Sequence, residues 1–208
     1  MNIDGEGELV LAFGRLVNEM IRHMGASYVW GDTLPLIKKA DMLLINLECV
    51  IAKNGTSWDK TPKLFFLRAD PHAIDVLKIA GVNYVSLANN HTLEEALLEM
   101  LNRLDNAGIA HAGAGSNLRE ASKPAVIEAG GMRVGVVSFT DNEPAFAATE
   151  ISPGTNYIPI MFADKIVKRV RATIDEARSL ADLGCSPSIG DLICERNPQK
   201  ASGSSRML

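Results

Sequence analysis

Two asparagines and a histidine follow an apolar stretch in the middle of this chain. The stretch, Val82–Leu87, leads through Ala88 into Asn89, Asn90 and His91. In open α/β sheets, ligands bind just beyond the carboxyl ends of strands, so a binding site would lie here. An amide oxygen and an imidazole can ligate a divalent metal, and a histidine can also protonate a leaving group. The alternative is that the asparagines only shape a turn, and that His91 caps or packs nearby.

Other strand ends carry side chains of the same kind. Asn46 and Glu48 follow one compact apolar run, and Asp141 and Glu143 follow another. Because strands of one sheet bring their ends to the same edge, these groups could meet the asparagine–histidine turn. A carboxylate, an amide oxygen and an imidazole together suit a hard or borderline divalent metal. Taken singly, Glu48 is better explained as a solvated loop acid and Asp141 as a turn former, because acidic residues are common in loops.

The elements that would position these side chains alternate between strands and helices. Apolar runs predict the strands, and apolar residues at helical spacing predict the helices between them. Apolar runs on either side of Gly130-Gly131 predict an antiparallel hairpin. This order predicts an α/β fold, layered, with a mixed and largely parallel sheet flanked by helices. Strands are expected near residues 9–13, 42–45, 64–67, 82–87, 109–112, 124–129 and 132–139, and the main helices near residues 70–81, 97–108 and 163–183.

The composition indicates a folded globular domain. The chain has 208 residues, of which 47% are hydrophobic, enough for one sizeable core. A formal net charge of -4 gives no reason to expect nucleic acid or an anionic membrane as partner. Three cysteines without a CxxC pair do not make a disulfide framework, and fit a reducing compartment. The sequence contains no secretory signal and no apolar run of membrane-spanning length, so we expect a cytoplasmic protein.

The character of the sequence changes after Gly184. Residues 184–208 are rich in serine, proline and glycine and show no sustained periodicity. Segments of this composition cannot bury enough apolar surface to fold on their own. We therefore expect one domain over residues 1–183 and an irregular, disordered tail over residues 184–208.

A series of short motifs occurs along the chain, at Trp30 to Pro35, Ala40-Asp41, Asn46 to Glu48, Ala88 to His91, Gly113 to Gly115 and Val136 to Glu143. Their order and spacing resemble the bacterial capsule synthesis protein CapA family. That family includes proteins associated with poly-γ-glutamate capsules and belongs to the calcineurin-like metallophosphoesterase superfamily. The resemblance covers residues 14–183 and implies a metallophosphoesterase-like fold.

The resemblance also implies roles for individual residues. The family's Asn-Leu-Glu motif falls on residues 46–48, which makes Glu48 a metal ligand. Its Ala-Asn-Asn-His motif falls on residues 88–91, which makes Asn90 a metal ligand and His91 the catalytic residue that contacts a phosphate oxygen or protonates the leaving group. The implied cofactor is a divalent metal (Mn, Fe or Zn), in a pair that activates water. The residues expected to support this site are Asn46, Asn89, Asp141 and Glu143.

The chain also departs from the family pattern. Where the family has a metal-binding aspartate in its first strand, this chain has Val10, with Gly7-Glu8 nearby. Glu94 and Ala96 stand where the family has an aspartate and a glycine. The family's later histidine motifs are absent, since no histidine follows His111. We therefore expect the N-terminal portion of such a domain, incomplete at its C-terminus, with a tail such as a truncation or altered reading frame would produce.

These observations leave different functions open. One is a metal-dependent phosphoesterase-like protein of capsule biosynthesis, acting on a phosphoester or capsule-related substrate. Another is a non-catalytic remnant or binding module that keeps the fold without a complete metal centre, because metal affinity depends on the number of ligands. A nucleotide-binding domain is the weakest reading, since no GxGxxG follows a first strand. An incomplete sheet would leave an edge uncovered, through which the protein could self-associate.

Overall fold

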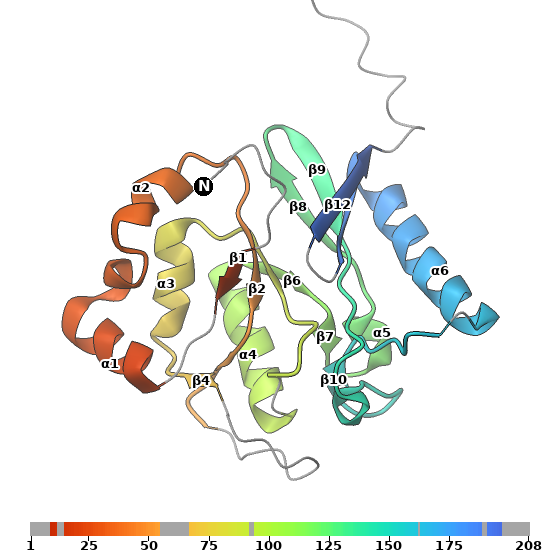
Figure 1. The fold of residues 1–208 in the computed structure, drawn as a ribbon, viewed down its shortest axis with the longest axis horizontal. Helices are drawn as coiled ribbons and strands as arrows, with labels where there is room; N and C mark the ends of the chain where they lie inside the picture. The colour runs from red at the N-terminus through yellow and green to blue at the C-terminus, as the bar shows by residue number, and fades with distance from the viewer. Residues whose placement is uncertain are drawn as a thin grey trace, which may run out of the picture.

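The computed structural model describes residues 9–11, 15–54, 67–91, 94–161, 163–188 and 191–196. Its first sheet is parallel throughout and has the strand order β1-β2-β5-β6. Helices connect its strands, as the parallel arrangement requires. The bounds are β1 Leu9–Leu11, β2 Leu44–Leu47, β5 Tyr84–Ser86 and β6 Ala110–Ala112, with α1 Arg15–Met24, α2 Leu34–Ile37, α3 Ala73–Ala80 and α4 Glu94–Ala107 between them (Figure 1).

The second sheet is mixed and has the strand order β12-β11-β9-β8. Strands β8 (Ala125–Ala129) and β9 (Met132–Val136) form the antiparallel hairpin that the sequence predicts. Gly130 and Gly131 connect them with positive φ angles of 57° and 76°, as a tight hairpin turn requires. Strand β11 (Leu183–Ser188) runs parallel to β9, and β12 (Asp191–Arg196) runs antiparallel to β11.

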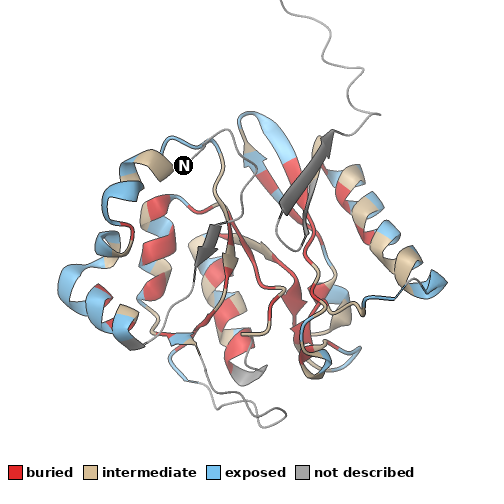
Figure 2. Cartoon of the chain, viewed as in Figure 1, coloured by how far each residue is buried: buried red, intermediate tan, exposed pale blue. Residues whose placement is uncertain are grey.

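The two sheets lie face to face, with helices on their outer sides. Tyr84 of β5 points into a cluster shared with Ile127 and Val134 of the second sheet. Its neighbour Val85 points the other way, into the larger core beneath α3 and α4. On the far side, α6 (Asp164–Leu180) lies so close to Gly135 that a Cβ there would be 2.8 Å from the Ala177 carbonyl oxygen. The layers are therefore helix, sheet, sheet, helix, with buried residues concentrated between them (Figure 2).

The structure agrees with the predicted mixed, largely parallel α/β architecture but divides it between separate sheets. The sequence suggested a single sheet with a hairpin attached. The hairpin instead belongs to the second sheet, because its inward-facing residues Ile127 and Val134 pack against Tyr84 across the interface. The helices predicted over residues 70–81, 97–108 and 163–183 are present as α3, α4 and α6. The strand expected near residues 64–67 lies almost entirely outside the described residues.

The segment after Gly184 also differs from the irregular tail suggested by the sequence. Strands β11 and β12 occupy residues 183–188 and 191–196. The pairing of Leu183 with Val134 and of Cys185 with Val136 carries the second sheet past the expected domain boundary. Backbone pairing with the edge of β9 satisfies N–H and C=O groups without any side-chain periodicity, which is why composition did not indicate these strands. Residues 197–208 lie outside the described residues.

Shorter elements complete the described part of the chain. Small two-stranded sheets are formed by β3 with β4 and by β7 with β10. The bounds are β3 Val50–Ile51, β4 Arg68–Ala69, β7 Ala114–Gly115 and β10 Gly154–Thr155, with α5 Leu118–Ala121 and the 3₁₀ turns η1 Ala26–Val29, η2 Gly31–Thr33 and η3 Pro144–Phe146. None of the described helices is both long and apolar enough to cross a membrane.

Candidate functional site

The carboxyl ends of β2 and β5 bring together polar side chains that are more than 40 positions apart in the sequence. The strands are parallel neighbours, with Asn46 paired to Ser86. The residues that follow each strand therefore meet at one edge of the sheet. Asn46 belongs to β2 and Glu48 follows it directly, whereas Asn89, Asn90 and His91 belong to the turn after β5.

Asn89 connects these two segments from a buried position. Its side chain is 5% exposed. Its Nδ2 donates to Oδ1 of Asn46 at 3.1 Å and to the Leu47 carbonyl oxygen at 2.9 Å, and its Oδ1 accepts from the His91 amide at 3.0 Å. Asn89 thus shapes the turn and holds it against β2, which leaves Asn90 and His91 to face other groups.

Glu48 and His91 face each other in this cluster. Nε2 of His91 lies 3.3 Å from Oε2 of Glu48, and Nδ2 of Asn46 donates to Oε1 of Glu48 at 2.7 Å. The two side chains are 21% and 23% exposed, so solvent reaches both. A carboxylate held by an amide and facing an imidazole can bind a cation or pass a proton.

Glu143 approaches the same turn from a distant part of the chain. Nδ2 of Asn90 donates to Oε1 of Glu143 at 3.1 Å. Glu143 has φ 49° and ψ 84°, and among the described residues it is the one non-glycine with positive φ. Backbone strain of this kind persists where surrounding contacts over-determine the conformation. Asp141 is half-buried two residues earlier, and within the described chain no hydrogen bond joins it to Asn90 or Glu48.

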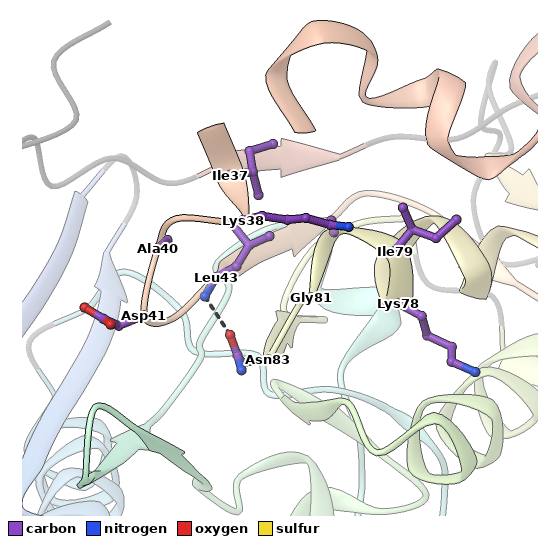
Figure 3. A pocket seen from close by; sticks show the side chains of 10 residues that line it. Ile37, Lys38, Ala40, Asp41, Leu43, Lys78, Ile79, Gly81 and Asn83 are labelled. Atoms are coloured by element: carbon purple, nitrogen blue, oxygen red, sulfur yellow. Dashed lines mark hydrogen bonds between the residues drawn. The ribbon is translucent and has the colours of Figure 1, made fainter. Parts of the chain in front are cut away.

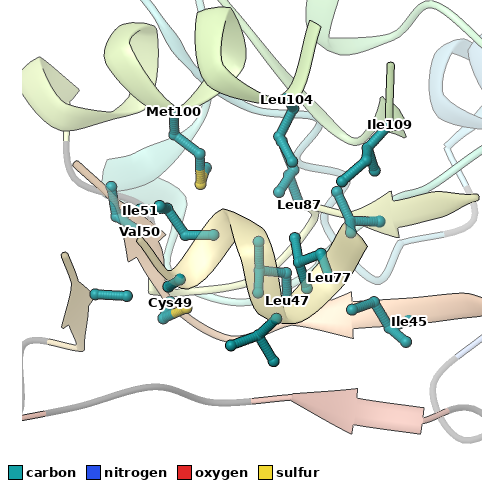
Figure 4. Close-up of a cluster of buried hydrophobic side chains, with 14 of the residues drawn as sticks. Ile45, Leu47, Cys49, Val50, Ile51, Leu77, Leu87, Met100, Leu104 and Ile109 are labelled. Atoms are coloured by element: carbon teal, nitrogen blue, oxygen red, sulfur yellow. The ribbon is translucent and has the colours of Figure 1, made fainter. Parts of the chain in front are cut away.

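The segment that carries Glu48 is firmly anchored. Residues 49–52 directly after it are buried, and Cys49, Val50 and Ile51 contribute to the core beneath α4 (Figure 4). The carboxylate of Glu99 on α4 then accepts from the Lys53 amide at 2.8 Å and the Asn54 amide at 3.3 Å. The Lys53 amide and the Arg103 side chain hold the pKa of Glu99 below its usual value. Sequence reasoning missed Glu99, whose one visible signal is its i,i+4 spacing to Arg103.

The cluster contains a carboxylate, an imidazole and amide oxygens, which are ligand types that divalent ions take in proteins. At 3.3 Å, Nε2 of His91 and Oε2 of Glu48 are in direct contact with each other. Across the described residues, no three His, Cys, Asp or Glu side chains gather closely enough to hold a metal. The register also places Val10, where the resemblance predicts an aspartate, opposite Asn46.

A separate cavity lies at the other end of the first sheet. It has a volume of about 360 Å³ and is lined by residues that precede β2 and β5, among them Leu43 and Asn83. Oδ1 of Asn83 accepts from the Leu43 amide at 2.8 Å, and Lys78 points away from this pair (Figure 3). The cavity therefore borders the amino-terminal ends of the strands, opposite the polar cluster, and contains none of the predicted site residues.

Comparison with known proteins matches residues 10–185 to the family model described as bacterial capsule synthesis protein PGA_cap. The chain is 28% identical over 178 residues to the capsule biosynthesis protein CapA of Bacillus anthracis, covering 83% of this chain and 43% of that protein. It is 32% identical over 135 residues to a probable polyglutamine synthesis accessory protein of Mycobacterium tuberculosis, covering 60% of this chain and 35% of that protein. The chain thus spans less than half the length of these relatives.

Proposed function

This chain belongs to the bacterial capsule synthesis protein family, and we propose that it acts in poly-γ-glutamate capsule biosynthesis through a phosphoester-binding metal site. The observation that carries the proposal is the contact between Glu48 and His91 at the carboxyl edge of the first sheet. This edge is where α/β sheets bind ligands, and the relatives' names supply the biological context. The substrate class is a phosphoester or an activated capsule precursor.

In this proposal, Glu48 and His91 would hold one divalent ion together with the side-chain oxygen of Asn90. Such an ion would lower the pKa of a bound water and neutralise phosphoryl oxygens. Asn46 fixes one oxygen of Glu48, so the other is oriented toward His91. Asn89 keeps His91 at the sheet edge through the His91 amide. Glu143 orients Asn90 by accepting from its Nδ2, which turns the amide oxygen away from Glu143.

A second candidate function is a binding module without hydrolytic activity. It is favoured by Val10 at the register position opposite Asn46 and by the lack of a three-residue metal cluster among the described residues. With fewer ligands than a metal pair needs, the site would bind one ion and a phosphate or carboxylate group without activating water. The two functions share a metal-binding step and differ in hydrolysis.

Thermal melting with Mn²⁺, followed by a hydrolysis assay, tests both candidates. Mn²⁺ at 100 times its Kd should raise the melting temperature by about 5 to 11 °C, since it adds about 2.7 kcal/mol to stability. His91→Ala should abolish this shift. The matched control is His111→Ala, which removes a histidine paired to Asp105 outside the cluster. Hydrolysis of a bis-aryl phosphate supports the phosphoesterase, whereas a shift without hydrolysis supports the binding module. No shift with Mn²⁺, Zn²⁺ or Fe²⁺ at millimolar concentration would refute both.

A further inference from the structure

Asn156 is a buried residue that connects distant segments through its main chain. It is 1% exposed and follows β10. Its amide donates to the Gly113 carbonyl oxygen at 2.8 Å, and its carbonyl oxygen accepts from the Thr140 amide at 3.2 Å. Gly113 lies in the turn after β6, and Thr140 lies in the segment after β9. The Asn156 backbone thus joins the end of the first sheet to the end of the second.

The side chain of Asn156 also has hydrogen-bond partners for both its nitrogen and its oxygen. Its Nδ2 donates to the Ser138 carbonyl oxygen at 2.8 Å, and its Oδ1 accepts from Oγ of Ser122 at 3.1 Å and from Nη2 of Arg169. Arg169, on α6, also donates to the Tyr157 carbonyl oxygen at 3.0 Å. These acceptors are neutral, and burial lowers the pKa of the Arg169 guanidinium. The guanidinium therefore anchors Asn156 and the next residue to α6.

Both segments joined by Asn156 lead into the polar cluster. A Cβ on Gly113 would lie 2.6 Å from Cβ of Ala88, so the turn after β6 presses directly against the residue before Asn89. Thr140 stands three residues before Glu143, and its Oγ1 accepts from the Asn142 amide at 3.1 Å. One half of the cluster is thus located through Gly113 and the other through Thr140.

We propose that Asn156, anchored by Arg169, is a positioning residue that sets the placement of Glu143 against the Asn90–His91 turn. The contact it protects is the 3.1 Å hydrogen bond from Asn90 to Glu143. The chemical role of Asn90, His91 and Glu143 rests on the proposed function, whereas the role of Asn156 in placing them does not. Loss of the hydrogen bonds from Arg169 should increase local unfolding of the segments after β5 and β9, without increasing local unfolding of α3.

Amide hydrogen exchange in the full chain tests this inference. Arg169→Met removes the donors and keeps the length of the side chain, and Arg171→Met on the exposed face of α6 is the matched control. In Arg169→Met, the amides of Thr140 and His91 should exchange about tenfold faster relative to those of α3, because a hydrogen bond to a charged group has been lost. Arg169→Lys, which retains a charged donor, should restore part of the protection. Asn156→Ala should reproduce the effect more strongly.

A uniform acceleration that includes α3 would show that Arg169 contributes only to global stability, and would overturn the proposal. Unchanged exchange at Thr140 and His91 would overturn it as well. Mn²⁺ affinity is the second readout, with a loss of about tenfold expected in Arg169→Met and none in Arg171→Met. If the wild-type chain does not bind Mn²⁺, the proposed function fails, and the exchange experiment still decides the role of Asn156.

Discussion

Replacing Gly113 by alanine should destabilise the protein severely. Gly113 has a φ of 93°, which costs an alanine about 1 to 2 kcal/mol. The added Cβ would lie 2.6 Å from Cβ of Ala88, 2.7 Å from its amide nitrogen and 2.9 Å from Cβ of Ser138. Cβ atoms and backbone nitrogens cannot rotate away from such contacts, so crowding should add about 1 to 3 kcal/mol. We expect a total loss of about 2 to 5 kcal/mol in the free energy of unfolding.

Gly108→Ala provides the matched control for this prediction. Gly108 also has a positive φ, 69°, but an added Cβ there has no other atom within 4 Å. The control therefore shares the conformational cost and lacks the crowding. Urea unfolding of both variants should show Gly113→Ala to be the less stable by about 1 to 3 kcal/mol. If the two variants lose the same free energy within about 0.5 kcal/mol, the turn after β6 does not press against Ala88, and Asn156 does not position the Asn89 turn through Gly113.

Two further substitutions test the segments on either side of the cluster. Glu99→Gln should cost about 1 kcal/mol at neutral pH, because a carboxylate acceptor for the Lys53 amide is lost. Folding lowers the pKa of Glu99 from its ordinary 4.5, so this stabilisation is present above pH 4.5 and disappears as the pH falls through the lower folded-state pKa. If the stability difference between variant and wild type stays constant in urea titrations down to about pH 3, the prediction is wrong. Asn89→Ala should cost about 2 to 3 kcal/mol in the same assay, because the Leu47 carbonyl oxygen loses a buried donor. A loss under about 0.5 kcal/mol would mean that water replaces the amide.

The sequence predicted that Asn46 and Glu48 lie near the residues that follow β5. Short apolar runs predicted the strands, and the rule that parallel strands bring their carboxyl ends to one edge predicted the neighbourhood. The structure places Asn89 within hydrogen-bond distance of Asn46, and His91 within 3.3 Å of Glu48. The metal-binding roles of Glu48 and Asn90 remain predictions from family resemblance.

The pairing of the two sheets could not be predicted in the same way. Tyr84 and Val85 are consecutive apolar residues, so the sequence predicts only that both faces of β5 are buried, as the structure confirms. It does not reveal that Tyr84 meets the hairpin across the interface, where its hydroxyl lies 2.6 Å from Oγ of Ser138. Contacts of this kind join residues 54 positions apart and depend on how whole layers pack. Local patterns of hydropathy contain no information on which layer supplies the partner.

The sequence named Glu143 as a supporting residue of the cluster, but it did not predict how the backbone turns this side chain toward Asn90. A residue before proline favours an extended backbone, so Glu143-Pro144 predicts a chain that runs on past the site. Glu143 instead has a φ of 49°, at a cost of about 1 to 3 kcal/mol. Its carbonyl oxygen accepts from the amide of Phe146, whose side chain is 1% exposed, so burial of the following turn offsets the strain. The direction of Glu143 toward Asn90 is therefore imposed by tertiary packing against the local preference of its own sequence.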